Sequence, residues 1–382
     1  MNKPVRVHFD MQSVGIPCGM GIYQTELALR LMKYDDLDIT ASYFLPVGED
    51  RNVECFDFPV KRVKFPTPFL YHTALGKSRR LLHAIERPLF RMLRPFVTYE
   101  SLVGDTGKNI YIFFDNRVPL VRVSGRIIAV IYDIIPMKCG SPDSGEAVKK
   151  NTEEVVRKAS KIITISEHSK KDIEESFHVS PEQIEVLYCG INPSDFAEDR
   201  DISRYNLPEK YILYFGSCNA HKNVPALVKA YSILPAEFMD TYKLVITNPS
   251  NEIKDLVNAQ GISEHVHYLD EVPDEDKPGI FRGASLFVWP SLYEGFGLLP
   301  ILEAQASGVP VVCSNAASMP EVAGDSAILF DPHDTEAIAS AIERVLTNED
   351  LRDELAVKGC ENIKRFSWDK SAQKLHDIII NL

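Results

Sequence analysis

The sequence predicts an α/β protein with two doubly wound domains, each built around a parallel sheet that is covered by helices. Short runs rich in Val, Ile, Tyr and Phe recur along the 382 residues and are separated by segments with helical patterning. These runs are apolar throughout, which is typical of parallel strands buried on both faces. They form two series, one on each side of a polar segment with two prolines at residues 190–208. A chain of this length also suggests two domains.

The first series predicts five strands and the second predicts six. In the first series these are VRVHFDM from Val5, NIYIFFDN from Asn109, RIIAVIYD from Arg126, KIITIS from Lys161 and IEVLYCGI from Ile184. In the second series they are YILYFGS from Tyr211, KLVITN from Lys243, VHYLDEV from Val266, LFVWPS from Leu286, VPVVCSN from Val309 and AILFDP from Ala327. Because ligands of such sheets bind outside the carboxyl ends of the strands, we expect the active site in the cleft between the two domains.

The composition excludes several classes of protein. The net charge of −12 argues against a nucleic-acid-binding protein, which would carry a basic excess. The seven cysteines are scattered and form no CxxC pair, so we expect reduced thiols and no zinc site. The N-terminus is typical of a strand and not of a signal peptide, and no apolar run approaches the roughly 18 residues of a membrane span. We therefore expect a cytoplasmic protein.

One segment, residues 61–94, differs from the acidic remainder of the chain. It contains nine basic residues and one acidic residue, Glu86, with aromatic and aliphatic residues between them. Such a basic amphipathic segment is typical of a segment that lies on an anionic membrane, and it predicts docking through Arg79, Arg80, Arg87 and Arg91. The alternative is a solvated basic helix whose apolar residues pack into the first domain.

Residues 291–312 carry the most informative chemical pattern. An apolar strand ends at Pro290, a loop bracketed by glycines follows, and a short helix runs to Gly308. A helix N-terminus presents free N–H groups and roughly half a positive charge, which suits an anion. Glu294 precedes the turn and Glu303 lies in the helix, and carboxylates are good acceptors for sugar hydroxyls. The pattern predicts a site for a sugar joined to a diphosphate. The structural alternative is that the first glutamate caps the turn and the second is solvated.

Other residues have a functional and a structural interpretation. Lys222 opens a predicted helix, where a lysine opposes the helix dipole, and this misfit predicts an anion as its partner. Asp133 follows a buried strand and either stabilises a turn or belongs to the site. Gly19 and Gly21 form either a tight turn or a loop near the acceptor or the diphosphate. They are not a dinucleotide fingerprint, because Gln24 stands where the third glycine would be.

Several of these motifs together resemble those of the retaining glycosyltransferases of family 4, which have the GT-B fold. The resemblance extends over most of the chain. It rests on SLYEGFG from Ser291, PILEAQASGVPVV from Pro300, PEVAGD from Pro320, HKN from His221, GMGIYQTELALRL from Gly19, AVIYDIIPM from Ala129 and ITISEHSKKDI from Ile163. The combination of SLYEGFG with PEVAGD is highly specific, whereas the N-terminal matches alone would be weak.

The resemblance implies transfer of a sugar from a nucleotide sugar, with retention of anomeric configuration and without a metal or another cofactor. It implies an acceptor-binding domain at residues 1–192 and a nucleotide-sugar-binding domain at residues 193–366. The final helix, residues 367–382, would pack back on the first domain. For retention, an oxygen of the leaving phosphate deprotonates the acceptor, so that no base from the enzyme is obligatory.

The resemblance also assigns roles by position. Glu294 would hold hydroxyls of the transferred sugar, Glu303 would hold the ribose, and Lys222 would neutralise the diphosphate as its charge grows in the transition state. The catalytic residues would be Glu294, Lys222 and Asp133. The donor site would be lined by Ser217, His221, Lys222, Gly295, Phe296, Gly297, Leu298 and Glu303. On the acceptor side would lie a loop with Gly19 and Gly21, together with Tyr132.

The spacing of the two glutamates departs from the family pattern. Eight residues separate Glu294 from Glu303, where the family has seven. We expect the extra residue to be Leu298 or Leu299 in the turn, because an insertion within the helix would rotate Glu303 by about 100°.

Two further positions differ from the family. Ser217 stands where an arginine is often found, so the diphosphate would depend on Lys222, with help from His221. Tyr132 replaces a histidine, which leaves Asp133 as the polar group near the acceptor.

The sequence therefore predicts a glycosyltransferase of cell-surface polysaccharide synthesis, such as O-antigen, capsule or lipopolysaccharide. It would transfer a hexose, in the first instance mannose from GDP-mannose, to a lipid-diphosphate-linked saccharide at the inner face of the cytoplasmic membrane. Within the class, the alternative is a soluble enzyme that makes a small glycoside from another nucleotide sugar. Outside it, the alternatives are a GT-B binding subunit that has lost catalysis and a sugar-nucleotide epimerase on the same fold.

Overall fold

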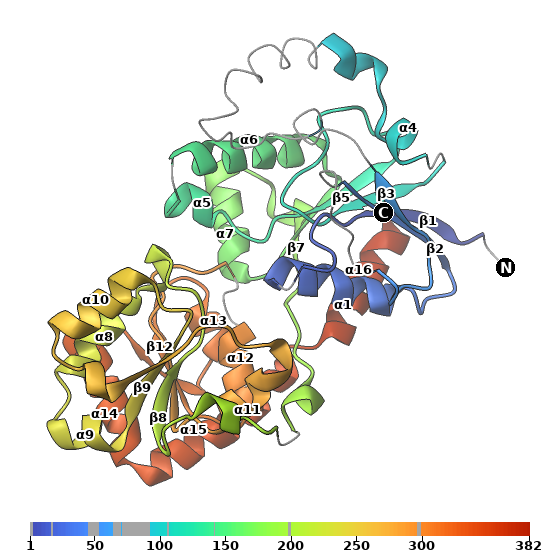
Figure 1. Ribbon diagram of the computed structural model, residues 1–382. Helices are drawn as coiled ribbons and strands as arrows, with labels where there is room; N and C mark the ends of the chain where they lie inside the picture. Colours follow the sequence, from blue (N-terminus) through green and yellow to red (C-terminus); the bar gives the residue numbers. More distant parts are fainter. Residues whose placement is uncertain are drawn as a thin grey trace. The chain divides into compact units, whose positions relative to one another are not determined.

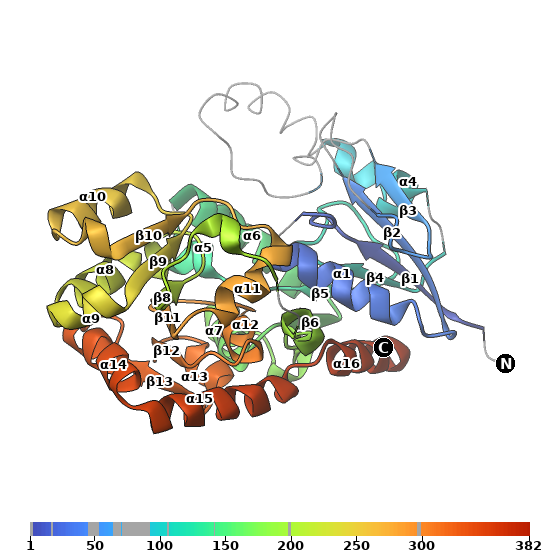
Figure 2. The same cartoon turned by 60° about the horizontal axis from the view of Figure 1, so that its bottom comes forward.

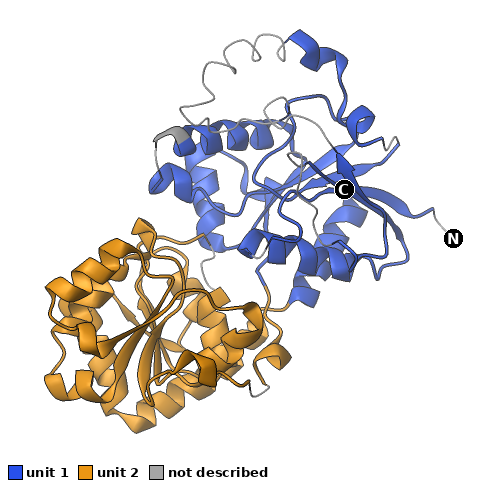
Figure 3. Ribbon diagram, viewed as in Figure 1, with its two compact units in different colours: residues 1–189, 368–382 blue, residues 190–367 orange. Residues whose placement is uncertain are grey.

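The computed structural model describes residues 3–16, 18–44, 53–63, 70, 92–104, 107–140, 142–197, 200–295 and 299–382. The chain forms two compact units (Figure 3). Unit 1 comprises Met1–Cys189 and Trp368–Leu382, and unit 2 comprises Gly190–Ser367. That unit 1 binds the acceptor and unit 2 the nucleotide sugar stays a prediction.

Unit 1 contains a seven-stranded sheet with the strand order β3-β2-β1-β4-β5-β6-β7, and neighbouring strands are parallel. The strands are β1 (Val5–Asp10), β2 (Leu37–Phe44), β3 (Val60–Val63), β4 (Ile110–Phe113), β5 (Arg126–Val130), β6 (Lys161–Thr164) and β7 (Ile184–Val186). Five of them were predicted from the sequence. β2 and β3 were missed, because β2 alternates apolar with polar residues and β3 is a short edge strand whose central residues are Lys61 and Arg62.

Among its described residues, unit 1 contains the helices α1 (Gly19–Leu31), α4 (Tyr99–Val103), α5 (Ile135–Lys138), α6 (Pro142–Lys158), α7 (Glu167–Phe177) and α16 (Trp368–Asn381). The last helix, α16, packs against the first, α1 (Figure 1). Nε of Arg30 donates to Oδ1 of Asp369 at 2.8 Å. The rings of Tyr34 and His376 stack with their centroids 4.1 Å apart. These contacts fix the end of the chain on unit 1.

Unit 2 contains a six-stranded parallel sheet with the order β10-β9-β8-β11-β12-β13. The strands are β8 (Tyr211–Tyr214), β9 (Lys243–Thr247), β10 (Val266–Leu269), β11 (Leu286–Trp289), β12 (Val311–Ser314) and β13 (Ala327–Phe330). All six were predicted from the sequence. β8, β11 and β12 are buried at every residue, which explains why they appear as continuous apolar runs.

Helices cover both faces of this sheet (Figures 1 and 2). They are α8 (Val224–Ser232), α9 (Ala236–Thr241), α10 (Asn251–Ala259), α11 (Lys277–Arg282), α12 (Leu299–Ala306), α13 (Met319–Ala323), α14 (Thr335–Thr347) and α15 (Glu349–Asn362). The strand order reverses between β8 and β11 in unit 2 and between β1 and β4 in unit 1. Ligands of doubly wound sheets bind at the carboxyl ends of the strands at such points.

In the described part of the chain, no helix combines the length and the hydropathy that a membrane span requires. The predicted docking residues Arg79, Arg80, Arg87 and Arg91 lie outside the described residues.

Candidate active site

The candidate site of unit 2 lies where β8 and β11 end side by side. After β8 the chain forms a 3-10 helix, Ala220–Lys222, and α8 begins at Val224. After β11 it continues through Glu294 toward α12. The N–H of Leu292 donates to the carbonyl oxygen of His221 at 2.8 Å, which holds the two connecting segments together.

Lys222 does not open helix α8, so that sequence prediction is wrong. Lys222 ends the preceding 3-10 helix, and α8 begins two residues later at Val224. Between them, Asn223 has a φ of 57° and interrupts the helical path. Its side-chain amide donates to the carbonyl oxygens of Pro290 at 3.2 Å and Pro332 at 2.8 Å. These hydrogen bonds of Asn223, to residues that follow β11 and β13, fix the backbone next to Lys222 just ahead of the N-terminus of α8.

Lys222 and Glu294 form an ion pair although 72 positions separate them in the sequence. The Glu294 carboxylate of this pair is buried, and the Lys222 side chain is partly buried, with 16% exposure. Nζ of Lys222 lies 2.7 Å from Oε1 of Glu294, and the hydroxyl of Ser291 donates to the same oxygen at 2.6 Å. Glu294 is 2% exposed. The hydroxyl of Ser318 donates to the carbonyl oxygen of Glu294 at 3.0 Å, so the backbone of this residue is also held. The structure therefore brings two predicted site residues together and adds Ser291 to them.

Burial and the neighbouring groups have opposite effects on the pKa of Glu294. Burial raises the pKa of Glu294, whereas the Lys222 ammonium and the Ser291 hydroxyl lower it. Burial, together with the charge of Lys222, lowers the pKa of His221, so this imidazole is neutral at pH 7. Lys222 is therefore the residue of the HKN motif that offers positive charge to an anion.

Glu303 lies in the second turn of α12, which runs uninterrupted from Leu299. Burial raises the pKa of Glu303 to about 7, while Lys277 acts against this shift and Asp274 adds to it. Of the two positions predicted for the extra residue, Leu299 is the first residue of the helix and Leu298 lies outside the described residues. The helix itself therefore contains no irregularity around Glu303.

Two of the remaining predicted donor residues, Ser217 and Gly295, follow β8 and β11 among the described residues. Ser217 is exposed, and its carbonyl oxygen accepts the hydroxyl of Tyr214 at 2.6 Å. Gly295 is buried next to Glu294. The other three residues of the glycine turn, Phe296, Gly297 and Leu298, lie outside the described residues, so their contact with sugar and phosphate stays a prediction.

In unit 1, Tyr132 and Asp133 follow β5. Oδ1 of Asp133 accepts the N–H of Ile135 at 2.9 Å, so the turn-stabilising role is present. Tyr132 is 5% exposed and its ring meets that of Tyr23 edge-on, with the centroids 5.4 Å apart. Burial raises the pKa of the Tyr132 phenol well above its ordinary value. Tyr132 thus packs in the core, and a contact of either residue with the acceptor stays a prediction.

Gly19 and Gly21 do not form a loop, so that prediction is wrong in its local structure. Both lie in the first turn of α1, where the sulfur of Cys18 accepts the N–H of Gly21 at 3.5 Å. A Cβ on Gly21 would lie 2.2 Å from the carbonyl oxygen of Ile16, so the backbone approaches closely only because this residue is glycine. The segment that precedes Gly19 is the connection from β1.

Sequence reasoning missed a polar network at the carboxyl ends of β1 and β4. Asp115 follows β4, and its Oδ2 accepts the N–H of Gln12 at 2.8 Å and Nε2 of Gln24 at 3.0 Å. Its Oδ1 accepts the hydroxyl of Ser13 at 2.5 Å. One carboxylate thereby holds the segment after β1 against the end of β4.

A second carboxylate, Asp10, ends β1 and is 2% exposed. Its oxygens accept Nε2 of Gln12 at 2.7 Å and the hydroxyl of Tyr99 at 2.5 Å. Burial raises the pKa of Asp10 to about 6, and the charge of Asp115 adds to this shift. The signal for both residues was present in the sequence, since each aspartate directly follows a phenylalanine at the end of a predicted strand (HFD and FFD).

Comparisons with known proteins identify the family of the chain. Residues 195–361 match the family described as glycosyl transferases group 1. Over 272 residues the chain is 34% identical to O-antigen chain mannosyltransferase B of Escherichia coli, with 68% of this chain and 71% of that protein covered. Over 273 residues it is 30% identical to the serotype-specific mannosyltransferase WbdA of Escherichia coli, which covers 67% of this chain. The match spans 33% of WbdA, which is a longer protein.

The fold has its counterpart in a solved structure. Sucrose-phosphate synthase from Thermosynechococcus elongatus matches with a TM-score of 0.75 at 18% identity, over 99% of this chain and 98% of that one. The two doubly wound units, together with this match over nearly the whole chain, identify the GT-B fold. The chain belongs to the group 1 glycosyltransferases of family 4, which are retaining enzymes that use nucleotide sugars. The predicted family, fold class and enzyme class are thus confirmed.

Proposed function

We propose that this glycosyltransferase transfers mannose from GDP-mannose to a lipid-diphosphate-linked saccharide during synthesis of a cell-surface polysaccharide of the O-antigen type. The observation that carries this proposal is the 34% identity to O-antigen chain mannosyltransferase B, which extends over 71% of that protein. The 30% identity to a second mannosyltransferase, WbdA, supports the same sugar.

The buried pair of unit 2 supports the assigned donor chemistry. On donor binding, the diphosphate becomes the partner of the Lys222 ammonium, and Glu294 is released to accept hydroxyls of the sugar. The leaving nucleoside diphosphate gains negative charge as the glycosidic bond breaks, and a cation already held in a desolvated place stabilises this charge strongly. Glu303, on α12, would accept hydroxyls of the ribose.

Transfer with retention then follows from the leaving group. The bond between the anomeric carbon and the phosphate oxygen breaks, and the acceptor hydroxyl forms its bond on the same face. The acceptor proton passes to an oxygen of the leaving phosphate, so neither a metal nor a base from the protein is required in this scheme. Among the described residues, no group of three or more His, Cys, Asp and Glu side chains is arranged to hold a metal ion. That the reaction needs no metal stays part of the proposal.

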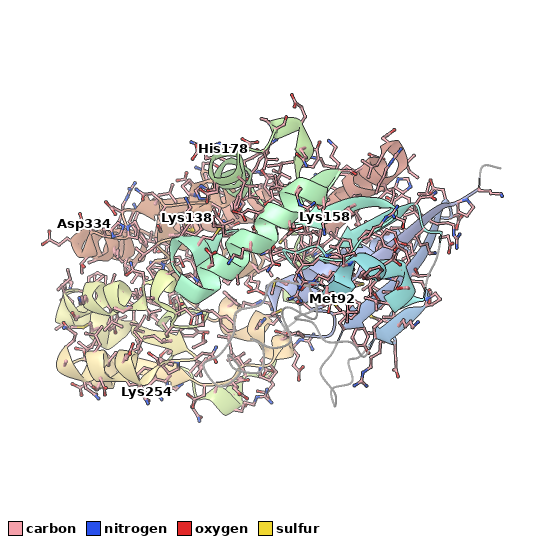
Figure 4. The ribbon with its side chains drawn as sticks, turned by 90° about the horizontal axis from the view of Figure 1, so that it is seen from above. Met92, Lys138, Lys158, His178, Lys254 and Asp334 are labelled. Carbon is pink, nitrogen blue, oxygen red and sulfur yellow. The ribbon has the colours of Figure 1, made fainter. Side chains whose placement is uncertain are left out.

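Binding at the inner face of the cytoplasmic membrane is the second part of the proposal. At the described end of the basic segment, Met92 (Figure 4) is 63% exposed and Phe96 is 83% exposed. Between them lies Arg94, in the 3-10 helix Arg94–Phe96. Large apolar side chains exposed beside basic residues suit insertion into the headgroup region of an anionic bilayer.

The first test is a panel of thermal shifts with GDP, UDP, dTDP and ADP and their common sugar conjugates. A ligand at about 100 times its Kd adds roughly 2.7 kcal/mol to the free energy of unfolding. We expect GDP and GDP-mannose to stabilise the full chain more than the other nucleotides. Stabilisation by a different base would overturn the donor assignment, and stabilisation by none would favour the binding-subunit alternative.

The second test is turnover of GDP-mannose by the purified chain. Slow release of GDP and mannose without an acceptor is expected of an intact transferase and would exclude the binding subunit. Conversion of the donor into an isomeric sugar nucleotide would instead indicate the epimerase. Faster turnover with a short water-soluble sugar than with lipid-linked saccharides would favour the soluble enzyme that makes a small glycoside.

A further inference from the structure

Trp289, the last residue of β11, contacts the lysine of the Lys222–Glu294 pair. Its indole is 1% exposed and stacks on the ring of Tyr214 from the neighbouring strand β8, with centroids 5.5 Å apart and planes at 15°. Nζ of Lys222 lies 4.8 Å from the centroid of the indole. This distance is within the range of a cation–π contact, for which Trp is the best aromatic partner.

The same indole contacts the backbone at the end of β8. A Cβ on Gly216 would lie 3.1 Å from Cη2 and 3.2 Å from Cζ3 of Trp289, so the glycine backbone rests on the ring. The N–H of Gly216 donates to Oγ1 of Thr247 at 2.8 Å. The hydroxyl of Tyr214 donates to the carbonyl oxygen of Ser217 at 2.6 Å. The stacked rings of Trp289 and Tyr214 thus contact the predicted donor residues Lys222 and Ser217, and the Trp289 ring also contacts Gly216.

A purely structural role explains this residue less well. The indole N–H of Trp289 is buried and has no hydrogen-bond partner among the described residues. A buried donor without a partner destabilises the fold, and a Phe or Leu would fill an apolar core position without that cost. What Trp adds over those residues is a broad π face, and one side of that face carries the Lys222 ammonium.

We propose that Trp289 is a positioning residue of the donor site, where its indole holds the Lys222 ammonium and the Gly216 backbone in place for the diphosphate of the donor. The inference rests on the proposed function in one respect, namely that Lys222 meets the diphosphate. A lysine has a flexible four-carbon stem, and fixing its ammonium before binding removes ordering that the ligand would otherwise have to impose. When Glu294 leaves Lys222 and accepts hydroxyls of the sugar, the indole still holds the Lys222 ammonium in place.

A double-mutant cycle tests this inference with GDP and UDP as probes, by titration calorimetry on the full chain. Trp289→Leu is expected to weaken binding of the diphosphate about tenfold, which is about 1.4 kcal/mol. In a Lys222→Met background the same change is expected to weaken it no more than about threefold, because the ammonium that the indole holds is gone. An equal factor in both backgrounds would show that Trp289 does not act through Lys222, and would overturn the inference.

Two variants separate positioning from core stability. Trp289→Phe keeps a ring face under Lys222 and is expected to retain binding within about threefold. Trp289→Met, which keeps an apolar side chain but has no ring, carries the cycle if the Leu variant does not fold. Phe281→Leu is the matched control, since Phe281 is fully buried and packs on Phe287 with centroids 5.4 Å apart. The control is expected to lower the unfolding temperature as much as Trp289→Leu while leaving the Kd unchanged. Equal loss of binding in the control would also overturn the inference.

Failure of the proposed function is distinguishable from failure of this inference. If the wild-type chain binds UDP and not GDP, the GDP-mannose assignment fails, and the cycle is measured with UDP. If it binds neither nucleotide, the diphosphate site itself is absent and both proposals are overturned.

Discussion

The two units use the same topological position for different chemistry. At the switch point of unit 2, the ends of β8 and β11 carry a cation and a carboxylate, Lys222 and Glu294, with the nitrogen and oxygen 2.7 Å apart. At the switch point of unit 1, the ends of β1 and β4 carry two carboxylates, Asp10 and Asp115. The first arrangement can exchange its internal partner for an external anion. The second already bonds its oxygens to backbone and side-chain donors of the same unit.

We infer from this difference that the ion pair of unit 2 can exchange a partner for a ligand, whereas the carboxylates of unit 1 hold a connecting segment in place. A buried ion pair is held by two charges, and removing one member leaves the other uncompensated. A ligand that supplies the missing charge can therefore replace either member. In unit 1, the oxygens of Asp115 accept hydrogen bonds from Gln12, Ser13 and Gln24 and fix the connection from β1 to α1. The comparison predicts that changes in unit 2 alter catalysis, whereas changes in the network of unit 1 alter stability.

The largest expected effect concerns the basic segment, residues 61–94. Replacing Arg79, Arg80, Arg87 and Arg91 with Glu should abolish binding to vesicles that contain phosphatidylglycerol, since each basic residue near an anionic surface contributes about 1 kcal/mol. The measurement is co-sedimentation with such vesicles. The matched control reverses four basic residues of unit 2, namely Lys210, Lys229, Lys254 and Lys358, and should bind like the wild type. Equal binding of both reversed proteins would refute docking through unit 1.

Loss of the Glu294 carboxylate should have the next largest effect. Glu294→Ala removes the predicted acceptor for sugar hydroxyls and also leaves the partly buried Lys222 without its partner. We expect kcat to fall about a thousandfold, which corresponds to about 4 kcal/mol. Because the carboxylate is buried and paired with Lys222, the same change should also lower the unfolding temperature.

Glu294→Gln distinguishes these two consequences of the change. The amide preserves the volume and removes the negative charge, so the variant should unfold closer to wild type than Glu294→Ala while remaining inactive. Glu271→Gln, at an exposed position of unit 2, is the control. Wild-type kcat in Glu294→Gln would contradict a role for the carboxylate in turnover.

Lys222→Ala should lower kcat by a factor on the order of one hundred to one thousand, or about 3–4 kcal/mol, by analogy with loss of one preorganised donor. It should also change the pH profile. Lys222 holds down the pKa of Glu294 against the effect of burial, so removal of the ammonium raises this pKa further. If the ionised carboxylate is needed, the acidic limb of kcat/KM moves to higher pH. Lys229→Ala, on the exposed face of α8, should leave both the rate and the profile unchanged.

Lys222 and Glu294 also show which features of the site can be predicted from the sequence. The glycine turn with its two glutamates identified Glu294, and the unfavourable charge near a helix start identified Lys222. Neither pattern shows that the two residues touch, because their contact depends on β8 and β11 being neighbours, and strand order is a property of the whole sheet. Ser291 and Trp289 were not identified from the sequence for the same reason. In the sequence Trp289 is one residue of an apolar strand, and Ser291 is a residue just after it.

The errors have local physical causes. Helix α8 begins at Val224 and not at the predicted Lys222, because Asn223 adopts a left-handed conformation and Pro225 follows in the first turn of the helix. Gly19 and Gly21 suggested a loop, but small residues also permit a helix to begin against the preceding backbone, as the close approach of Ile16 to Gly21 shows. Glycine indicates a tight local geometry in both cases, and the sequence alone does not distinguish them.

The smallest effect expected is on stability, in unit 1, and it depends on pH. The pKa of Asp10 is raised from 3.8 to about 6 in the folded chain, so between these values the folded state holds a proton that the unfolded state has lost. This contribution to the free energy of unfolding is present in full below pH 3.8 and is lost as the pH rises through about 6. Asp10→Asn resembles the protonated form and should remove this pH dependence, which is on the order of 1–3 kcal/mol.

Urea unfolding of wild type and Asp10→Asn at several pH values between 4 and 7 measures this effect as a difference between the two proteins, so that other titrating groups cancel. The stability of the wild type relative to the variant should fall as the pH rises. The Kd for GDP, measured at pH 7 on the same samples, should be equal for the two proteins, because Asp10 belongs to the rigid network of unit 1 and Lys222 to the exchanging pair of unit 2. A difference that is constant with pH would show that the carboxyl of Asp10 is ionised throughout, and a change in the Kd would break the division of roles between the two switch points.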